Sequence, residues 1–255
     1  MCLIAFAWQA MPDHPLLMIA NRDEFYARQA APMDFWDDQP QILAGRDLSA
    51  GGTWLGVSRN GRLAAVTNVR VRQSPSASPK SRGELVTDFL QSEKSAKPFA
   101  DALQAEAACY GPFNLLLWDG EQMHYAGNTP EFRSTAVTPG LHALSNAALD
   151  TDWPKARRAK TALSAWIASR LRDEAGTLEA LNDRGLADDE NLPQTGVGLD
   201  MERTLSSPFI VTPTYGTRCS SLIRVDSDRQ IQVLEQRYEA GGQISGLSRF
   251  AFTAS

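Results

Sequence analysis

Two nearly continuous apolar runs open the chain, at residues 2–9 and 16–21. The segment Met11-Pro12-Asp13-His14-Pro15 between them contains two prolines and an aspartate, which favour the end of one strand and the start of the next. We therefore predict a β-hairpin at the N-terminus.

A second hairpin is predicted where Asn60-Gly61 separates apolar segments at residues 53–58 and 63–67. This dipeptide tolerates the positive φ angles of a tight reversal, so the two segments are expected to pair as antiparallel strands.

Helices are predicted in the middle of the chain, where apolar residues recur at three- and four-residue spacing. The expected helices span residues 83–90, 97–109, 153–171 and 178–184. In the longest, residues 153–171, Pro154 fits the first turn and Asp152 is the expected N-cap.

Further strands are predicted between the second and third helices and again at the end of the chain. They are predicted at residues 113–118, 122–125, 141–144, 209–211, 220–225, 231–236 and 250–253. Residues 72–81 are expected to form a flexible surface loop and residues 188–198 a loop. Because there are few strand–helix alternations, we expect an α+β layered fold with mainly antiparallel pairing, in one domain spanning residues 1–255.

The charge of the chain argues against a nucleic-acid partner. The net charge is −5 and the pI about 5.3, and the basic residues form no stripe that would follow a phosphate backbone. The apolar run at residues 3–8 is too short to span a bilayer and has no charged leading region, so no membrane span is expected.

Cysteine and histidine usage favours a reducing cytoplasm and no resident metal. The three cysteines are an odd number without a CxxC pair, and the three histidines are isolated, each expected on the surface or in a loop. These residues are Cys2, Cys109, Cys219, His14, His124 and His142.

Cys2 directly follows the initiator methionine, and three interpretations compete: a buried hydrophobe, a lipid attachment point, or a nucleophile. A second residue this small permits removal of Met1, which leaves Cys2 with a free α-amino group. An α-amine has a pKa of about 7.7 to 8.0 and can accept the proton of the thiol, so one residue would supply both base and nucleophile.

Polar residues follow the strand that is predicted to pair with the one carrying Cys2. Asn21, Arg22, Asp23 and Glu24 stand at its end, so hairpin geometry brings them towards Cys2 at one sheet edge. The alternative is a solvated strand end with weak ion pairs. Asn68 ends another predicted strand and is either a site residue or a turn residue.

Four ordered motifs resemble the NRDE family, also called the transport-and-Golgi-organisation family. They are MIANRDEF at 18–25, AGRDLSAGGTWLGVSRNGRLAAVTN at 44–68, LSNA at 144–147 and YGTRCSSL at 215–222. The resemblance implies a relation to the N-terminal nucleophile hydrolases, whose fold places two antiparallel sheets between helical layers. The implied architecture is a four-layer αββα sandwich.

The resemblance also implies roles for individual residues. Cys2 matches the nucleophile of cysteine amidases similar to bile-salt hydrolase, penicillin V acylase and acid ceramidase. In those relatives the second strand ends in Arg-x-x-Asp, whereas Asn21 and Glu24 occupy these positions here.

Three further residues resemble groups around such a nucleophile. Asn68 resembles an asparagine that binds the oxyanion, Asn146 a second polar group lining the pocket, and Arg218 a late arginine that supports the nucleophile. Arg22 or Arg218 is expected to lower the pKa of the Cys2 thiol electrostatically.

Two functional hypotheses follow, from different classes. The first is an amidohydrolase or acyltransferase that cleaves a linear, non-peptide C–N bond in a small, partly apolar amide, without cofactor or metal. The second is a carrier of haem, lipid or acyl-CoA, since family members have been linked to such cargo. The chain has no CxxCH motif, so Cys2, Cys219 or a histidine would have to ligate haem transiently. A hydrolase fold used only as a scaffold is the third possibility.

Overall fold

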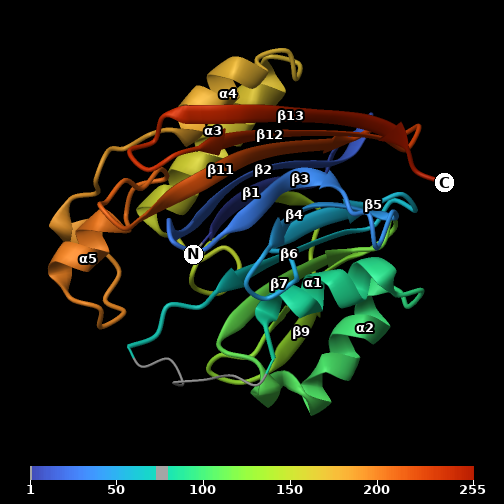
Figure 1. Cartoon of the computed structure of the whole chain (residues 1–255), viewed down its shortest axis with the longest axis horizontal. Helices are drawn as coiled ribbons and strands as arrows, with labels where there is room; N and C mark the ends of the chain where they lie inside the picture. Colours follow the sequence, from blue (N-terminus) through green and yellow to red (C-terminus); the bar gives the residue numbers. More distant parts are fainter. Residues whose placement is uncertain (1, 73–79) are drawn as a thin grey trace.

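The N-terminal hairpin lies in the middle of the first of two β-sheets (Figure 1). The computed structural model describes residues 2–72 and 80–255. Strand β1 (Cys2–Met11) pairs antiparallel with β2 (His14–Phe25), as predicted, and Ile4 lies opposite Ala20. Most of the segment 72–81, predicted to be a flexible loop, falls outside the described residues.

The first sheet has six strands in the order β10-β1-β2-β11-β12-β13, all antiparallel. Its remaining strands are β10 (Gly140–Leu144), β11 (Tyr215–Val225), β12 (Gln230–Tyr238) and β13 (Ile244–Thr253).

The second sheet has seven strands that follow chain order, β3 to β9. They are β3 (Ala30–Phe35), β4 (Ile42–Asp47), β5 (Leu55–Ser58), β6 (Leu63–Asn68), β7 (Phe113–Trp118), β8 (Met123–Gly127) and β9 (Arg133–Ala136). The hairpin around Asn60-Gly61 is confirmed as β5–β6, with φ of 83° at Gly61.

Helices cover the outer faces of both sheets (Figure 1). Helices α1 (Arg82–Gln91) and α2 (Ala96–Ala102) pack on the second sheet, and α3 (Pro154–Ala168) and α4 (Glu174–Leu181) on the first. The short α5 (Leu199–Thr204) precedes β11. The molecule is therefore a four-layer αββα sandwich, as expected.

Several local predictions need correction. The helix expected over residues 97–109 ends at Ala102, and two 3₁₀ turns, Leu103–Ala105 and Ala107–Cys109, follow it. Trp153, not Asp152, is the N-cap of α3; Asp152 instead pairs with Arg157 at 2.8 Å.

Further corrections concern strands and histidines. Residues 209–211 do not form a strand, and strands β3, β4 and β9 and helix α5 were not predicted. His124 and His142 are buried on β8 and β10, not exposed, because both strands lie inside the sandwich.

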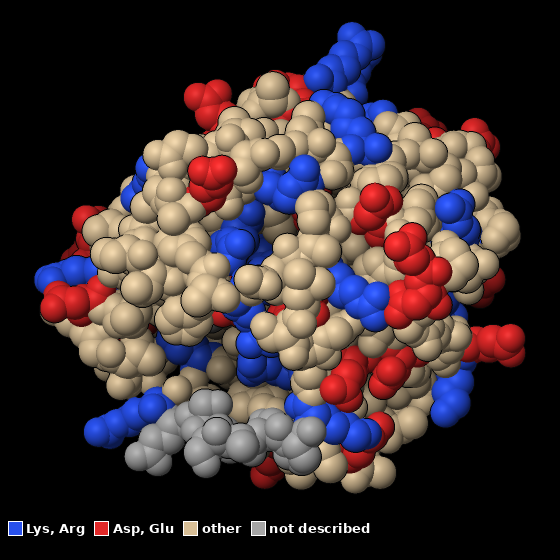
Figure 2. Space-filling view, viewed as in Figure 1, with Lys and Arg blue, Asp and Glu red and all other residues tan. Residues whose placement is uncertain are grey.

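Charged side chains are unevenly placed over the face shown in Figure 2. Lys and Arg side chains gather in a furrow across the middle of this face, while Asp and Glu lie mostly around it. None of the described helices is both long and apolar enough to cross a membrane.

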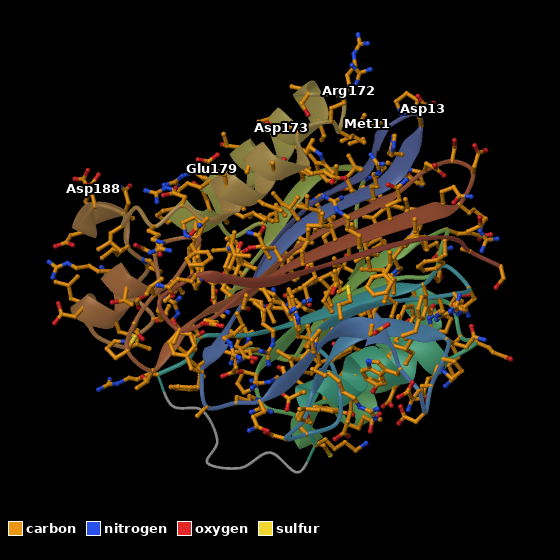
Figure 3. The ribbon with its side chains drawn as sticks, turned by 45° about the horizontal axis from the view of Figure 1, so that its top comes forward. Met11, Asp13, Arg172, Asp173, Glu179 and Asp188 are labelled. Atoms are coloured by element: carbon orange, nitrogen blue, oxygen red, sulfur yellow. The ribbon has the colours of Figure 1, made fainter. Side chains whose placement is uncertain are left out.

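Strand β1 is apolar at nearly every position because both of its faces are buried. Leu3 and Ala5 pack in the core beneath α3, whereas Ile4 and Phe6 face the second sheet. Figure 3, in which Asp173 and Glu179 mark α4, shows the α3–α4 layer on the outer side of the first sheet. Cys2 has the parity of Ile4 and Phe6, so the fold directs it towards the space between the sheets.

Candidate functional site

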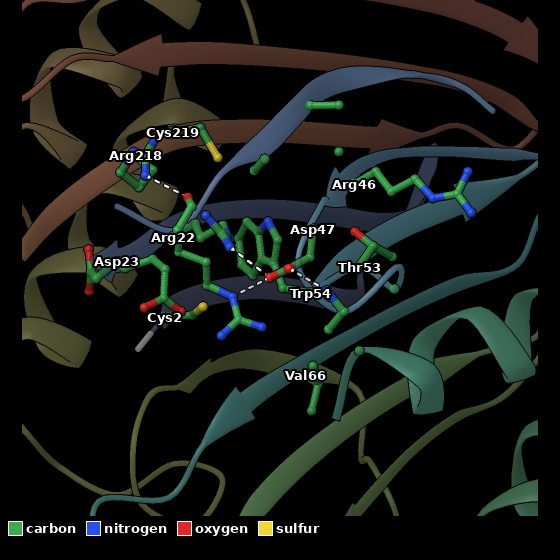
Figure 4. Close-up of a pocket in the computed structure, with 18 of the residues that line it drawn as sticks. Cys2, Arg22, Asp23, Arg46, Asp47, Thr53, Trp54, Val66, Arg218 and Cys219 are labelled. Atoms are coloured by element: carbon green, nitrogen blue, oxygen red, sulfur yellow. Dashed lines mark hydrogen bonds and ion pairs between the residues drawn. The ribbon is translucent and has the colours of Figure 1, made fainter. Parts of the chain in front are cut away.

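Cys2 opens on a cavity of about 620 Å³ between the two sheets (Figure 4). Of the eight residues expected at the site, the cavity is lined by Cys2, Arg22, Asp23, Glu24, Asn68 and Arg218. Asn21 and Asn146 are not part of its lining.

Strand register brings these residues together from distant parts of the chain. Arg22 lies opposite Cys2 across the β1–β2 pair and opposite Cys219 across the β2–β11 pair. The register shifts between Thr217 and Cys219, an irregularity that re-aims side chains at a sheet end.

The thiol of Cys2 is buried, with 7% of the residue exposed. Burial raises the pKa of this thiol above its ordinary value, and the positive charge of Arg22, which acts in the opposite direction, does not overcome the effect. The thiol is therefore protonated near neutral pH and needs a base to become a nucleophile.

Arg22 is held in the cavity by Asp47 of β4. Their nearest nitrogen and oxygen are 3.6 Å apart, and Asp47 also accepts a hydrogen bond from Arg28 (Figure 4). Burial acts to raise the pKa of Asp47, but the hydrogen bond and charge of Arg28 keep it below the usual value. The carboxylate stays ionised and fixes two cations in the cavity wall.

Asp23 and Lys155 are two buried side chains of opposite charge, and each acts electrostatically on the other. Asp23 accepts a hydrogen bond from Thr217 Oγ1 at 2.8 Å. Burial raises the pKa of Asp23, with the charge of Lys155 opposing that rise. Burial lowers the pKa of Lys155 to about 8, with the charge of Asp23 acting to raise it.

Lys155 was missed by the sequence analysis. It lies in the first turn of α3 and is 1% exposed. A lysine in the first turn of an amphipathic helix is ordinarily solvated, and its burial here depends on how α3 docks on the first sheet. No local pattern signals that contact.

Asn146 connects the site without lining the cavity. Its Nδ2 donates to the Asn68 carbonyl at 3.0 Å, and its Oδ1 accepts from Lys155 Nζ at 3.1 Å and from Ser145 Oγ at 3.2 Å. Ser145 Oγ also lies 3.1 Å from the Cys2 carbonyl oxygen. Asn146 thus fixes Asn68 and Lys155 relative to the strand that carries Cys2.

Asn21 faces away from the cavity, because side chains alternate along β2. Its Nδ2 donates to the carbonyls of Leu181 and Pro208, both at 2.9 Å, and its Oδ1 accepts from Ser220 Oγ at 2.6 Å. The side chain therefore ties β2 to the end of α4 and to the segment before β11.

Arg218 and Glu24 line the cavity but bond to nearby backbone. Arg218 Nη1 donates to the carbonyls of Phe25, Tyr26 and Arg28 at 3.1, 3.3 and 3.1 Å. Glu24 accepts the N–H of Phe25 at 2.8 Å. Arg218 therefore stabilises the turn that follows β2.

A buried ion pair, also missed from the sequence, fixes α5. Arg70 Nη1 lies 2.6 Å from Glu202, and both side chains are almost fully buried. Burial lowers the pKa of Arg70, with Glu202 opposing that change. Glu202 also accepts hydrogen bonds from the backbone and hydroxyl of Thr195, at 2.8 and 2.6 Å.

Within residues 2–72 and 80–255, no three His, Cys, Asp or Glu side chains are grouped so as to hold a metal ion. Cys2, Cys109 and Cys219 are free thiols.

The fold and the cavity define an αββα protein with a cysteine at the start of its first strand and polar groups around it. The chain belongs to the Transport and Golgi organisation 2 family, whose sequence model matches residues 1–240. This finding confirms the family indicated by the four motifs.

Curated relatives match over most of their length. The chain is 34% identical to the bovine (Bos taurus) Transport and Golgi organization protein 2 homolog and 33% identical to the human (Homo sapiens) one, covering 92% of each chain in both cases. It is 23% identical to the Drosophila melanogaster protein, again over 92% of each.

Among solved structures, the chain is similar to the Caenorhabditis elegans N-acylethanolamine-hydrolyzing acid amidase ortholog. The TM-score is 0.48 at 11% identity, with 87% of this chain and 92% of that chain covered. This likeness is too distant to carry an argument about function.

Proposed function

We propose that this protein is a cysteine amidohydrolase or acyltransferase that acts on a linear, non-peptide C–N bond, with Cys2 as an N-terminal nucleophile after removal of Met1. The observation that carries the proposal is the position of the Cys2 thiol. It opens on a cavity whose volume is within the range of small-molecule sites. A thiol sealed in hydrocarbon would have excluded this chemistry.

The proposed reaction proceeds through a thioester. The α-amine of Cys2 takes the thiol proton, and the sulfur attacks the carbonyl carbon of the substrate amide. The C–N bond then breaks, and the amine of the substrate leaves with that proton. Water then attacks the thioester carbon and gives one proton to the α-amine. The C–S bond breaks, the carboxylic acid departs, and the Cys2 sulfur takes that proton from the α-ammonium group. Transfer to another amine instead of water gives the acyltransferase reaction.

Neighbouring groups support each step of this proposal. Asn68 lies across the cavity from the first sheet and is our candidate donor to the oxyanion. We assign the buried charges of Lys155 and Asp23 the role of orienting the α-amine, since both interact electrostatically with Cys2. Arg22 favours the thiolate over the thiol.

The proposed substrate is small and partly apolar, because Trp54 and Val66 line the cavity beside its polar groups. A cytoplasmic location remains our expectation, supported by three free cysteines.

The test is a hydrolysis screen with N-acyl amino acids, lactams and bile-type amides. We expect turnover by the wild type and none by Cys2→Ala. Cys109→Ala is the matched control, since Cys109 is outside the cavity lining and should retain full activity. Equal activity of Cys2→Ala and the wild type would refute the proposal.

Haem carriage is the alternative that the sequence left open, and Cys2 and Cys219 are the two sulfurs of the cavity lining that would bind iron. It predicts a Soret shift that saturates at one haem per chain and weakens in Cys2→Ala or Cys219→Ala. The same titration of Cys109→Ala should match the wild type.

A further inference from the structure

The cavity beside Cys2 carries more positive than negative side chains, although the net charge of the whole chain is −5. Seven Lys and Arg residues and four Asp and Glu residues line it. They are Arg22, Arg28, Arg46, Lys80, Arg82, Arg218 and Arg237, against Asp23, Glu24, Asp47 and Glu235. The furrow of basic side chains in Figure 2 is consistent with this excess.

Most of these cations are already paired with a carboxylate. The pairs are Arg46 with Asp38, Lys80 with Glu106, Arg237 with Glu235, and both Arg22 and Arg28 with Asp47. Their charge is therefore largely compensated by the protein itself.

Arg82 and Arg218 differ, because among the described residues neither forms an ion pair. Arg82 Nη1 donates to the Pro112 carbonyl at 3.2 Å, and all three hydrogen bonds of Arg218 come from Nη1. A guanidinium has five N–H donors. Each arginine thus has no carboxylate partner among the described residues and keeps further N–H donors in the wall of the cavity.

The two arginines approach the site from different layers. Arg82 is the first residue of α1, which packs on the second sheet, and Arg218 lies on β11 of the first. The charge of Arg82 acts on both Cys2 and Glu24. An anion held by Arg82 would therefore lie close to the thiol.

We propose that the substrate of Cys2 carries an anionic oxygen group, a carboxylate or a phosphate, on its leaving amine, and that Arg82 and Arg218 bind this group. The inference rests on the proposed function and specifies its substrate class. Guanidinium groups bind such oxyanions through paired hydrogen bonds that a neutral isostere lacks. The acyl chain then lies against Trp54 and Val66, which belong to the apolar part of the lining.

The test is equilibrium binding to full-length Cys2→Ala protein, which prevents turnover. Three ligands share one acyl chain: N-dodecanoylglycine, its neutral glycinamide, and N-dodecanoylphosphoethanolamine. By calorimetry we expect at least one anionic ligand to bind about tenfold or more tightly than the glycinamide, and the tighter of the two identifies carboxylate or phosphate.

Variants made in the Cys2→Ala background assign the preference to residues. Arg82→Met and Arg218→Met should each reduce the ratio of anionic to neutral affinity. Arg157→Met removes the same charge and serves as the control. Arg157 pairs with Asp152 on the surface of the protein, so this variant should leave the ratio unchanged.

Equal affinity for anionic and neutral ligands, or no binding of either anion, overturns the inference, and so does an unchanged ratio in both arginine variants. Because Cys2→Ala retains its arginines, the ligand comparison stands even if an arginine variant does not fold. An anion preference without hydrolysis by the wild type would uphold the subsite and reject only the enzymatic function.

Discussion

The charge of Lys155 should cost the folded protein stability at neutral pH. Burial lowers the pKa of this lysine from 10.5 to about 8. Such a shift corresponds to about 3.4 kcal/mol by which the charged form destabilises the folded state. The side chain is fully buried, so solvent does not screen this term.

The direction in which stability changes with pH follows from proton binding in the folded and unfolded states. Between pH 8 and 10.5 the unfolded chain holds the Lys155 proton more often than the folded chain does, so stability rises with pH in this window. Relative to Lys155→Met, the wild type should gain about 1.3 kcal/mol in free energy of unfolding between pH 7 and pH 9.

The assay is urea unfolding of both proteins across this pH range, so that groups shared by the two chains cancel. Lys94→Met is the control, because Lys94 is exposed and its curve should parallel the wild type. A double variant, Lys155→Met with Asp23→Asn, removes the buried carboxylate that the single variant leaves without this cation. Parallel wild-type and Lys155→Met curves would refute the reasoning.

Three other predictions concern the frame of the site. Asn21→Ala should lower the free energy of unfolding by about 2–3 kcal/mol, because two buried carbonyls lose their donor; an unchanged urea midpoint would contradict this. Glu202→Gln should cost about 3–5 kcal/mol by leaving Arg70 buried without its counterion. Asp200→Asn, a change in an exposed carboxylate, should cost little, and equal losses in the two variants would count against the buried pair. Asn68→Ala should lower kcat about 10²–10³-fold if it binds the oxyanion; steady-state kinetics showing a change in KM alone would exclude that role.

The long central strands were predictable because burial on both faces requires an apolar residue at nearly every position. Strand β1 shows this from Cys2 to Trp8. The edge strands β3 and β9 escaped prediction for the opposite reason: β3 contains Pro32, and β9 is exposed or half-exposed throughout. Their pairing comes from neighbouring strands and leaves no apolar alternation in the sequence.

The site was predictable only where strand pairing determines it. Cys2 and Arg22 lie opposite each other because the short turn between β1 and β2 fixes the register of the two strands. Because side chains alternate along β2, Asn21 lies on the opposite face of the sheet from Arg22. Its position next to Arg22 in the sequence already implied this. Lys155 enters the site through the docking of α3, a long-range contact with no local signal.

The central claim is that Cys2 reacts through its own free α-amine. Its most direct test is the intact and peptide mass of the protein after incubation with an N-acyl amide and an acid quench, in chains without Met1 and in chains carrying an extra residue before Cys2. The account predicts an acyl adduct on Cys2 only in chains whose α-amine is free. An adduct on another residue, equal adducts in both chains, or none while the amide is hydrolysed would contradict it.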